Sequence, residues 1–212
     1  MSATNRGGTR QPDDFYATPA WCVERLLEKL QLPGGNWLEP GAGEGNLIKA
    51  VRRNDIRWTA LELREECRPR LEALDVRPEI IITDKFIENV PEDQKPLHGR
   101  HFDVAFGNPP FNLAMEFIEE SLKYADTVVM LLRLNFIGTQ GRCEFMQTHA
   151  PDLYILPDRP SFDGKGSDSI EYAWFVWNKA SLNRSVGQTT VLDRTPAAVR
   201  KATKRLHLLR AA

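Results

Sequence analysis

The stretch that decides the fold reads Trp37-Leu38-Glu39-Pro40-Gly41-Ala42-Gly43-Glu44-Gly45-Asn46. Residues 36–39 form a short apolar run and residues 44–53 carry a helical pattern, so the glycines lie between an expected strand and an expected helix. Glycines at alternate positions permit a tight turn and a close approach of the backbone to a ligand. The spacing Gly-x-Gly-x-Gly differs from the Gly-x-Gly-x-x-Gly of dinucleotide-binding folds. A tight strand-to-helix turn without a ligand is the simpler alternative.

Short apolar runs and helical patterns alternate along the rest of the chain. We expect strands at 36–39, 57–63, 79–83, 102–106, 127–132, 153–156 and 171–177, and helices at 20–30, 44–53, 65–74, 112–122 and 141–149. Thr18 is the expected cap of the first helix and Asn112 that of the fourth. This alternation predicts an α/β fold: a Rossmann-like, mainly parallel sheet of seven strands with helices on both faces. Residues 157–170 hold two prolines, two glycines and three serines and make a poor crossover helix. The last two strands should therefore form an antiparallel hairpin.

The composition excludes several classes of protein. The 212 residues suit one domain, and 42% hydrophobic with 27% charged residues is ordinary for a globular protein. No run approaches the ~20 apolar residues that cross a bilayer, and the polar N-terminus lacks a signal-peptide pattern. The three cysteines, Cys22, Cys67 and Cys143, are too scattered for a disulfide framework or a zinc site. We therefore expect a cytoplasmic protein with free thiols, no membrane contact and no metal.

Charge divides the chain into three parts. We expect a flexible arm at 1–14, one domain at 15–179 and a basic tail at 180–212. The tail carries seven positive charges and one negative charge, whereas the remaining residues hold 21 positive and 28 negative charges. A basic tail on an acidic body suggests contact with a polyanion such as nucleic acid. A solvated terminal helix is the alternative, and the oligomeric state is unknown from these features.

Acidic residues surround the glycine loop and indicate its ligand. Glu39 and Glu44 flank the loop, where they would repel a pyrophosphate and favour a cationic group. Glu62 ends the second strand, 19 residues after Gly43, and is expected to accept hydrogen bonds from ribose hydroxyls. Asp84 follows the third strand and can accept a hydrogen bond from an adenine amino group. Ribose, adenine and a cationic centre together describe S-adenosylmethionine.

The fourth expected strand ends in Asn108-Pro109-Pro110-Phe111. Ligands of open α/β sheets bind beyond the carboxyl ends of the strands, so Asn108 should lie beside the cofactor. Its amide oxygen and the Pro109 carbonyl can accept both protons of a planar amine, which leaves the nitrogen lone pair free to attack a methyl group. The prolines fix the backbone, and the Phe111 ring offers a stacking face for a base. The alternative is a rigid turn before a helix that Asn112 caps.

With these motifs, residues 15–179 resemble class I S-adenosylmethionine-dependent methyltransferases, and more narrowly small DNA adenine-N6 methyltransferases. Residues 15–19 (Phe15-Tyr16-Ala17-Thr18-Pro19) resemble the segment that holds the methionine end of the cofactor. Residues 38–45 resemble the first cofactor motif, and the Asn-Pro-Pro-Phe tetrapeptide resembles the catalytic motif. Residues 159–162 and 171–177 resemble the hairpin near the target base.

The resemblance implies a complete site. Its expected catalytic residues are Asn108, Pro109, Pro110 and Phe111. The expected cofactor-binding residues are Tyr16, Thr18, Pro19, Glu39, Pro40, Gly41, Ala42, Gly43, Gly45, Asn46, Glu62, Asp84, Phe86 and Asn108. The expected substrate-binding residues are Phe111, Arg159, Phe162 and Lys165. In this family the base is swung out of the duplex, so Phe162 would help to hold it and Lys165 would meet a phosphate. Phe162 could equally be a loop anchor in the core.

Three hypotheses about function remain from the sequence. The first is methyl transfer to an exocyclic amino group of a nucleic-acid base, adenine N6 in DNA, by direct attack without a covalent intermediate. The second is the same chemistry on RNA bases (adenine N6 or guanine N2) or on a protein glutamine amide. The third is a non-catalytic nucleic-acid-binding subunit. No Pro-Cys pair occurs, which disfavours a cytosine-C5 enzyme. Only 33 residues follow the expected domain (15–179), so specificity should come from short loops, the tail or a second subunit.

Overall fold

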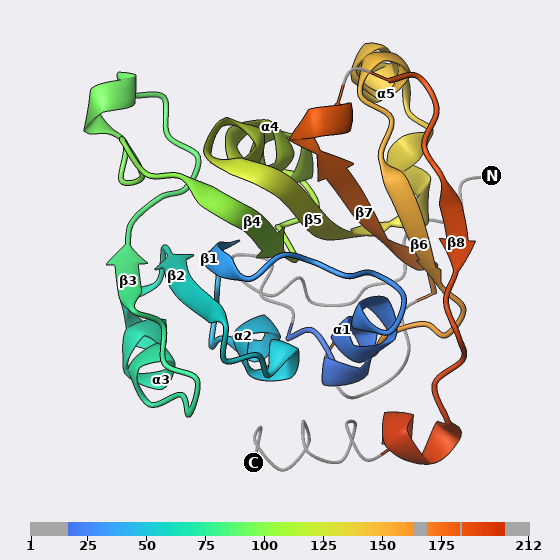
Figure 1. Ribbon diagram of the computed structural model, residues 1–212, viewed down its shortest axis with the longest axis horizontal. Coiled ribbons are helices and arrows are strands. Elements are labelled where there is room, and N and C mark those ends of the chain that lie inside the picture. Colours follow the sequence, from blue (N-terminus) through green and yellow to red (C-terminus); the bar gives the residue numbers. More distant parts are fainter. Residues whose placement is uncertain (1–16, 163–168, 183, 202–212) are drawn as a thin grey trace, which may run out of the picture.

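The computed structural model describes residues 17–162, 169–182 and 184–201. This part of the chain holds one eight-stranded sheet in the order β3-β2-β1-β4-β5-β7-β6-β8 (Figure 1). Its strands are β1 (Gly35–Pro40), β2 (Ile56–Glu62), β3 (Ile80–Thr83), β4 (Phe102–Gly107), β5 (Ala125–Arg133), β6 (Asp152–Leu156), β7 (Tyr172–Asn178) and β8 (Thr189–Val191). All neighbouring strands are parallel except β7, which runs antiparallel to β5 and β6. The expected Rossmann-like sheet with one antiparallel strand in a C-terminal hairpin is confirmed.

Helices cover both faces of the sheet, as expected. The helices α1 (Ala20–Leu27), α2 (Asn46–Val51) and α3 (Arg68–Glu72) pack on one face, and α4 (Ala114–Tyr124) and α5 (Cys143–Thr148) pack on the other (Figure 1). Short 3-10 helices lie in the connections: η2 (Glu65–Cys67), η3 (Glu92–Gln94), η4 (Leu134–Ile137), η5 (Gln140–Arg142) and η6 (Lys179–Ser181). Because successive strand residues point to opposite faces, neighbours such as Trp37 and Leu38 enter different cores.

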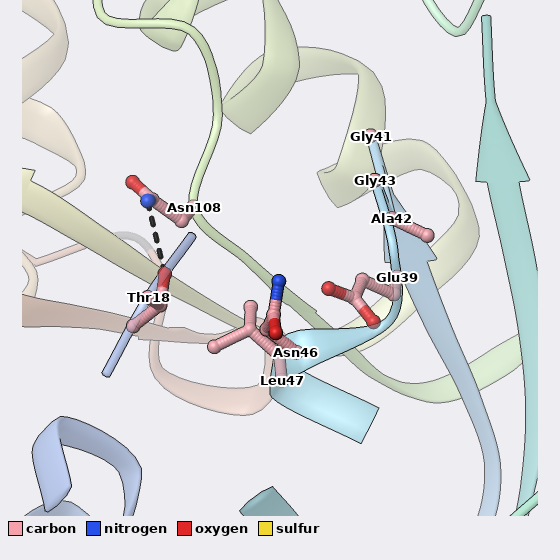
Figure 2. A pocket seen from close by; sticks show the side chains of 8 residues that line it. All are labelled: Thr18, Glu39, Gly41, Ala42, Gly43, Asn46, Leu47 and Asn108. Atoms are coloured by element: carbon pink, nitrogen blue, oxygen red, sulfur yellow. Dashed lines mark hydrogen bonds between the residues drawn. The ribbon is translucent and has the colours of Figure 1, made fainter. Parts of the chain in front are cut away.

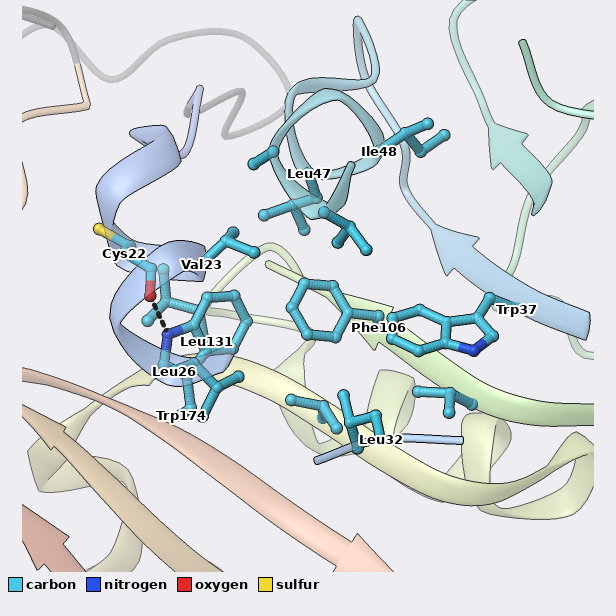
Figure 3. Packing of buried hydrophobic residues seen from close by; sticks show 14 of the residues in the cluster. Cys22, Val23, Leu26, Leu32, Trp37, Leu47, Ile48, Phe106, Leu131 and Trp174 are labelled. Carbon is cyan, nitrogen blue, oxygen red and sulfur yellow. Dashed lines mark hydrogen bonds between the residues drawn. The ribbon is translucent and has the colours of Figure 1, made fainter. Parts of the chain in front are cut away.

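A row of buried aromatic rings crosses the sheet beneath α1. Trp37 of β1, Phe106 of β4 and Trp174 of β7 follow one another with centroid separations of 5.7 and 4.9 Å. The indole N–H of Trp174 donates to the Cys22 carbonyl of α1 at 2.9 Å, so this buried donor is satisfied (Figure 3). Burial of each such ring stabilises the fold by roughly 1.5–3 kcal/mol. The row therefore fixes α1 on the sheet, and with it the residues that precede the helix.

Two expected helix caps are wrong. The N-cap of α1 is Pro19, and the Thr18 hydroxyl instead accepts a hydrogen bond from the Asn108 side chain. The N-cap of α4 is Leu113 rather than Asn112, because a turn from Pro110 to Leu113 takes up that residue before the helix begins. In both places a tertiary or turn contact overrides the local capping preference.

The sheet has one strand more than the seven expected. β8 lies within the segment expected as a basic tail and extends the sheet beside β6. Leu192 is buried in the core beneath α1, and the Thr195 amide donates to Asp158 at 2.7 Å. The Asp158 side chain is only 4% exposed and also contacts Arg194 and Arg200 at 3.4 and 3.3 Å. Residues 189–195 are therefore integrated into the domain.

We expect that replacing Asp158 with alanine lowers the free energy of unfolding by roughly 3 kcal/mol, because it leaves the Thr195 amide and two arginines without their buried acceptor. Urea unfolding monitored by circular dichroism measures the loss. Asp193→Ala is the control, since its ion pair with Lys29 is largely solvent-exposed and should contribute little. Equal, small effects of the two substitutions would show that Asp158 does not anchor the segment.

Candidate functional site

The candidate site lies where the strand order reverses. From β1 the chain proceeds through β2 to β3 at one edge, then returns to β4 on the other side of β1. β1 and β4 are parallel neighbours, with Leu38 opposite Ala105. Their carboxyl ends are therefore adjacent, and their connections diverge to opposite sides. This geometry brings the glycine loop after Pro40 next to the segment that begins at Asn108.

A pocket opens to solvent at this junction, with about 340 Å³ of space not filled by protein atoms when the open solvent at its mouth is included (Figure 2). Its lining residues come from three stretches of the chain (residue 18, residues 39–47 and residue 108) and are Thr18, Glu39, Gly41, Ala42, Gly43, Asn46, Leu47 and Asn108. Seven of these eight were expected at the cofactor site. Leu47 was missed because its apolar side chain in α2 reads as an ordinary core position, which it also fills.

The glycine loop adopts a backbone that other residues rarely adopt. Gly41, Gly43 and Gly45 have φ angles of +71°, +55° and +71°. The amides of Gly41 and Ala42 both donate to the Leu61 carbonyl of β2, at 2.8 and 2.9 Å. The loop is thus clamped to the neighbouring strand, with backbone exposed to the pocket.

Glu39 gives the pocket its electrostatic character. Its side chain lies within the pocket (Figure 2), the residue is only 3% exposed, and its Oε2 atom has no hydrogen-bond partner among the described residues. Burial raises the pKa of this carboxyl well above its ordinary value, and the nearby charge of Glu62 adds to the effect, while a hydrogen bond from the Ile48 amide opposes it. A cationic ligand would relieve this cost of burying a negative charge. Glu44, by contrast, forms an ion pair with Arg70, so the expected repulsion of anions rests on Glu39.

Glu62 lies behind the loop rather than in the pocket lining. Its Oε2 accepts the Gly43 amide at 2.6 Å, and its Oε1 accepts the amide and Nε of Arg64 at 3.1 and 2.8 Å. Asp84 is exposed just after β3 and accepts the Lys85 amide at 2.7 Å. Phe86 is buried against Phe117 with ring centroids 5.0 Å apart. Among the described residues, three further expected cofactor-binding positions lie outside the lining: Pro19, Pro40 and Gly45.

The Asn108 side chain is oriented by a residue 90 positions earlier. Its Nδ2 donates to the buried Thr18 hydroxyl at 3.0 Å, as Figure 2 shows. Gly107, just before it, sits in a tight space: a Cβ there would lie 3.2 Å from the Met130 sulfur and 3.6 Å from the Pro40 ring. Glycine at this position thus allows the end of β4 to lie close against Met130 of β5.

Beyond Asn108, an arginine and aromatic rings form a second cluster. The Arg133 guanidinium carbon lies 4.4 Å from the centroid of the half-buried Phe111 ring, and its Nε donates to the Tyr172 hydroxyl at 3.3 Å. Tyr172 also packs near Phe111 and Phe162, with centroid separations of 5.8 and 5.2 Å. Arg133 was missed by the sequence reasoning, although it ends a strand next to β4, where ligand-facing residues concentrate.

Two expected substrate-binding residues have internal partners. Phe162 is buried in the core beneath α1, as a loop anchor would be, and Arg159 forms an ion pair with Glu171. Tyr16 and Lys165 lie outside the described residues. Over the described ranges, no cluster of His, Cys, Asp or Glu side chains is suited to a metal ion, and no helix has the length and apolarity to cross a bilayer.

Comparison with solved structures shows that this fold is shared with methyltransferases. A candidate RNA methyltransferase from Pyrococcus horikoshii matches with a TM-score of 0.55 and 13% identity, covering 82% of this chain and 90% of that one. A candidate class I S-adenosylmethionine-dependent methyltransferase from Listeria monocytogenes matches with a TM-score of 0.54 and 12% identity, covering 90% and 67%. The 23S rRNA methyltransferase ErmE matches with a TM-score of 0.55 and 16% identity, covering 92% and 76%. No family model and no curated protein matches the sequence.

We expect Glu39→Gln to stabilise the ligand-free protein at neutral and alkaline pH. An unfolded glutamate ionises near about pH 4.3, whereas burial raises the folded-state pKa of Glu39, so wild-type stability falls as the pH rises between the two values. The variant should match the wild type near about pH 4.5. At about pH 8 its melting temperature should lie a few degrees above that of the wild type, because each kcal/mol of added stability raises the melting temperature by about 2–4 °C.

Differential scanning calorimetry at both pH values measures this difference. Glu44→Gln is the control, because the Glu44 carboxylate is paired with Arg70 and its loss should give no gain at the higher pH. A Glu39→Gln protein that melts below the wild type at about pH 8 would contradict the interpretation.

Proposed function

We propose that this protein is an S-adenosylmethionine-dependent methyltransferase that modifies an exocyclic amino group of a nucleic-acid base, adenine N6 in DNA. The observation that carries the proposal is the shared pocket, in which the buried Glu39 carboxylate and the glycine loop lie beside Asn108. A cation site next to an amide suited to a planar amine fits methyl transfer from a sulfonium donor. The fold shared with the 23S rRNA methyltransferase ErmE supports the same proposal.

The residues of the pocket fit the cofactor. The buried Glu39 carboxylate favours a positively charged group, and the backbone of Gly41 to Gly43 allows close approach without side chains. Glu62, at the end of β2, is the expected acceptor for the ribose. When bound, S-adenosylmethionine supplies an electrophilic methyl group for direct attack by a nitrogen atom.

Asn108 is the proposed catalytic residue. Thr18 holds the nitrogen of its amide group, which directs the amide before any substrate arrives. A preorganised acceptor for the amine protons stabilises the charge that develops on the attacking nitrogen without reorganisation during the reaction. The buried Pro109, whose ring fixes its φ angle, is the proposed second acceptor through its carbonyl.

The nucleic-acid substrate is supported by two features. The Phe111 ring and the Arg133 guanidinium lie together just beyond Asn108, and both groups can stack on bases. Residues 180–212 carry seven positive charges. Arg184, Arg194 and Arg200 form ion pairs with aspartates of the domain, and the other four charges suit a phosphate backbone. The choice of adenine N6 in DNA as the methyl acceptor rests on the resemblance of the Asn-Pro-Pro-Phe motif to that of DNA adenine-N6 methyltransferases. RNA is the second candidate, favoured by the similarity in fold to an rRNA methyltransferase.

Transfer of a labelled methyl group tests the proposal. The protein is incubated with S-adenosylmethionine carrying a radioactive methyl and with double-stranded DNA, single-stranded DNA, RNA or protein extract. We expect label in DNA, recovered as N6-methyladenine after digestion to nucleosides. Label in RNA alone would select the second candidate, and label in protein would indicate a glutamine amide. No transfer to any acceptor would overturn the enzymatic proposal in favour of a binding subunit.

We expect Asn108→Ala to reduce methyl transfer at least about a hundredfold, because loss of a preorganised hydrogen-bonding group costs roughly 10²–10³ in rate. Binding of S-adenosylhomocysteine, measured by calorimetry, should stay within about threefold of the wild type. The matched control is Asn112→Ala, which removes an exposed asparagine four residues further along the chain. An Asn108→Ala enzyme with wild-type turnover would exclude the proposed role.

A chain truncated after Lys201 should bind nucleic acid with a weaker salt dependence. The deletion removes three basic residues, Lys204, Arg205 and Arg210, and retains β8 and its contacts with Asp158. Each phosphate contact contributes about 0.9 to the slope of log K against log salt concentration on duplex DNA, so the slope should fall by up to about 3. Fluorescence anisotropy titrations at several salt concentrations measure it. An unchanged slope would mean that these residues do not contact nucleic acid.

A further inference from the structure

Arg133 lies beside the proposed active site, at a position that no motif of the sequence indicates. It ends β5, which lies between β4 and β7 in the sheet (Figure 1). Gly107, the last residue of β4, pairs with Met130 of β5, so Arg133 lies three residues beyond the end of β4. Side chains alternate between the two faces of a strand, and Leu131 enters the core beneath α1. The Arg133 side chain therefore belongs to the face of the sheet that α1 covers.

The Tyr172 hydroxyl fixes the direction of the Arg133 side chain. The two residues are directly opposite each other in the antiparallel pairing of β5 with β7, which places their side chains next to each other on one face. The Leu134 amide donates to the Glu171 carbonyl at 2.9 Å and holds this pairing at the end of β5. The Arg133 Nε donates at 3.3 Å to the hydroxyl of Tyr172, a residue that is 0% exposed. A buried ring has little freedom to move, so its hydroxyl anchors the guanidinium.

The Phe111 ring lies against this guanidinium. The guanidinium carbon of Arg133 is 4.4 Å from the ring centroid, well inside the ~6 Å within which a cation is attracted to an aromatic face. The Tyr172 ring packs beside it at an interplanar angle of 46°, with centroids 5.8 Å apart. The two residues before Phe111 are prolines, which restrict the backbone from which the ring projects. Two side chains from β5 and β7 therefore orient a ring that follows β4.

An arginine and a phenylalanine make the same kind of contact outside the pocket lining. The guanidinium carbon of Arg142 lies 4.0 Å from the centroid of the Phe136 ring, and its Nε donates to the Phe136 carbonyl at 2.8 Å. Phe136 belongs to the core on the α4 side of the sheet, so this arginine covers a ring that the core already encloses. Phe111, by contrast, is half-buried and lies three residues after Asn108. Arg133 therefore holds a ring that is partly open to a ligand.

We propose that Arg133 is a positioning residue for the methyl acceptor: it holds the Phe111 ring with one face against the guanidinium, so that a base stacks on the opposite face. This role rests on the proposed function, because it concerns the binding of a base beside Asn108. Arg133 acts through Phe111 rather than as a second stacking surface. A ring that is ordered before the base arrives removes part of the conformational entropy cost of binding.

Fluorine NMR of the full chain labelled with 4-fluorophenylalanine tests, without any substrate, whether Arg133 holds the ring. The Phe111 signal is assigned by its absence from the Phe111→Leu variant. Arg133→Met should move that signal toward its position in the urea-unfolded protein, because the cation and its link to Tyr172 are both lost. Arg133→Lys keeps the charge and should move the signal less. Tyr172→Phe removes only the hydroxyl and should move it in the same direction as Arg133→Met.

Arg142→Met is the matched control for the fluorine signals, since it removes the same kind of contact from Phe136. It should move the Phe136 signal and leave the Phe111 signal in place. A Phe111 signal that does not move in Arg133→Met would overturn the positioning role. If Arg133→Met does not fold, Arg133→Lys and Tyr172→Phe decide the same question.

A double-mutant cycle tests whether Arg133 acts through the ring. The KM is measured for the nucleic acid that takes up label in the methyl-transfer experiment. Loss of a base–aromatic stack costs roughly fivefold or more in affinity, so Phe111→Leu should raise the KM by at least that factor. Arg133→Met should raise the KM at least about threefold in the wild-type background but less than about twofold in the Phe111→Leu background, because residues that act as a unit are not additive. Affinity for S-adenosylhomocysteine should stay at the wild-type value in all three variants.

The remaining outcomes overturn the role in distinguishable ways. Equal effects of Arg133→Met in both backgrounds would indicate that Arg133 contacts the substrate directly and does not act through Phe111. An Arg142→Met protein whose KM rises as much as that of Arg133→Met would reduce the effect to the loss of a positive charge. A wild-type protein that transfers no methyl group to nucleic acid would overturn the proposed function and with it the stacking of a base on the ring. The fluorine signals would still decide whether Arg133 holds Phe111.

Discussion

The parallel pairing of β1 with β4 is the constraint on which the candidate site depends. The two strands end side by side while their connections leave in opposite directions, so the backbone opens into a pocket at that point. At the end of β4, Gly107 leaves little free space: a Cβ there would lie only 3.2 Å from the Met130 sulfur of β5 and in van der Waals contact with the Pro40 ring of β1. The aromatic row through Trp37 and Phe106 holds the same two strands from below. Core packing and site geometry are therefore consequences of one strand arrangement.

Three glutamates near the glycine loop have different physical roles because their surroundings differ. Glu39 is buried in the pocket, and burial raises its pKa. Glu62 is equally withdrawn from solvent, but two contacts with Arg64 and one with Gly43 satisfy its charge. Glu44 is turned toward Arg70 and away from the pocket lining. The pocket thus contains one carboxylate, that of Glu39, whose ionised form is destabilised by burial. A cationic ligand would offset that free-energy cost.

The C-terminal part of the chain supports the substrate side of the proposed site. Tyr172, which starts β7, lies between Phe111 and Phe162 and accepts a hydrogen bond from Arg133. Asp158, just after β6, ties the segment around Thr195 to the same region. The hairpin, the edge strand β8 and the segment after it therefore brace the region beyond Asn108.

The sequence by itself determined the α/β order, the hairpin and the loop glycines, because periodicity and backbone strain are local properties. It also placed seven of the eight pocket-lining residues at the candidate site. Only the tertiary structure decided the partners: Thr18 orients Asn108 instead of capping α1, Arg64 holds Glu62, and Arg133 covers Phe111. β8 likewise became a strand only through the open edge of β6. Such contacts join residues whose local sequence leaves several partners equally available, so packing of the whole chain selects among them.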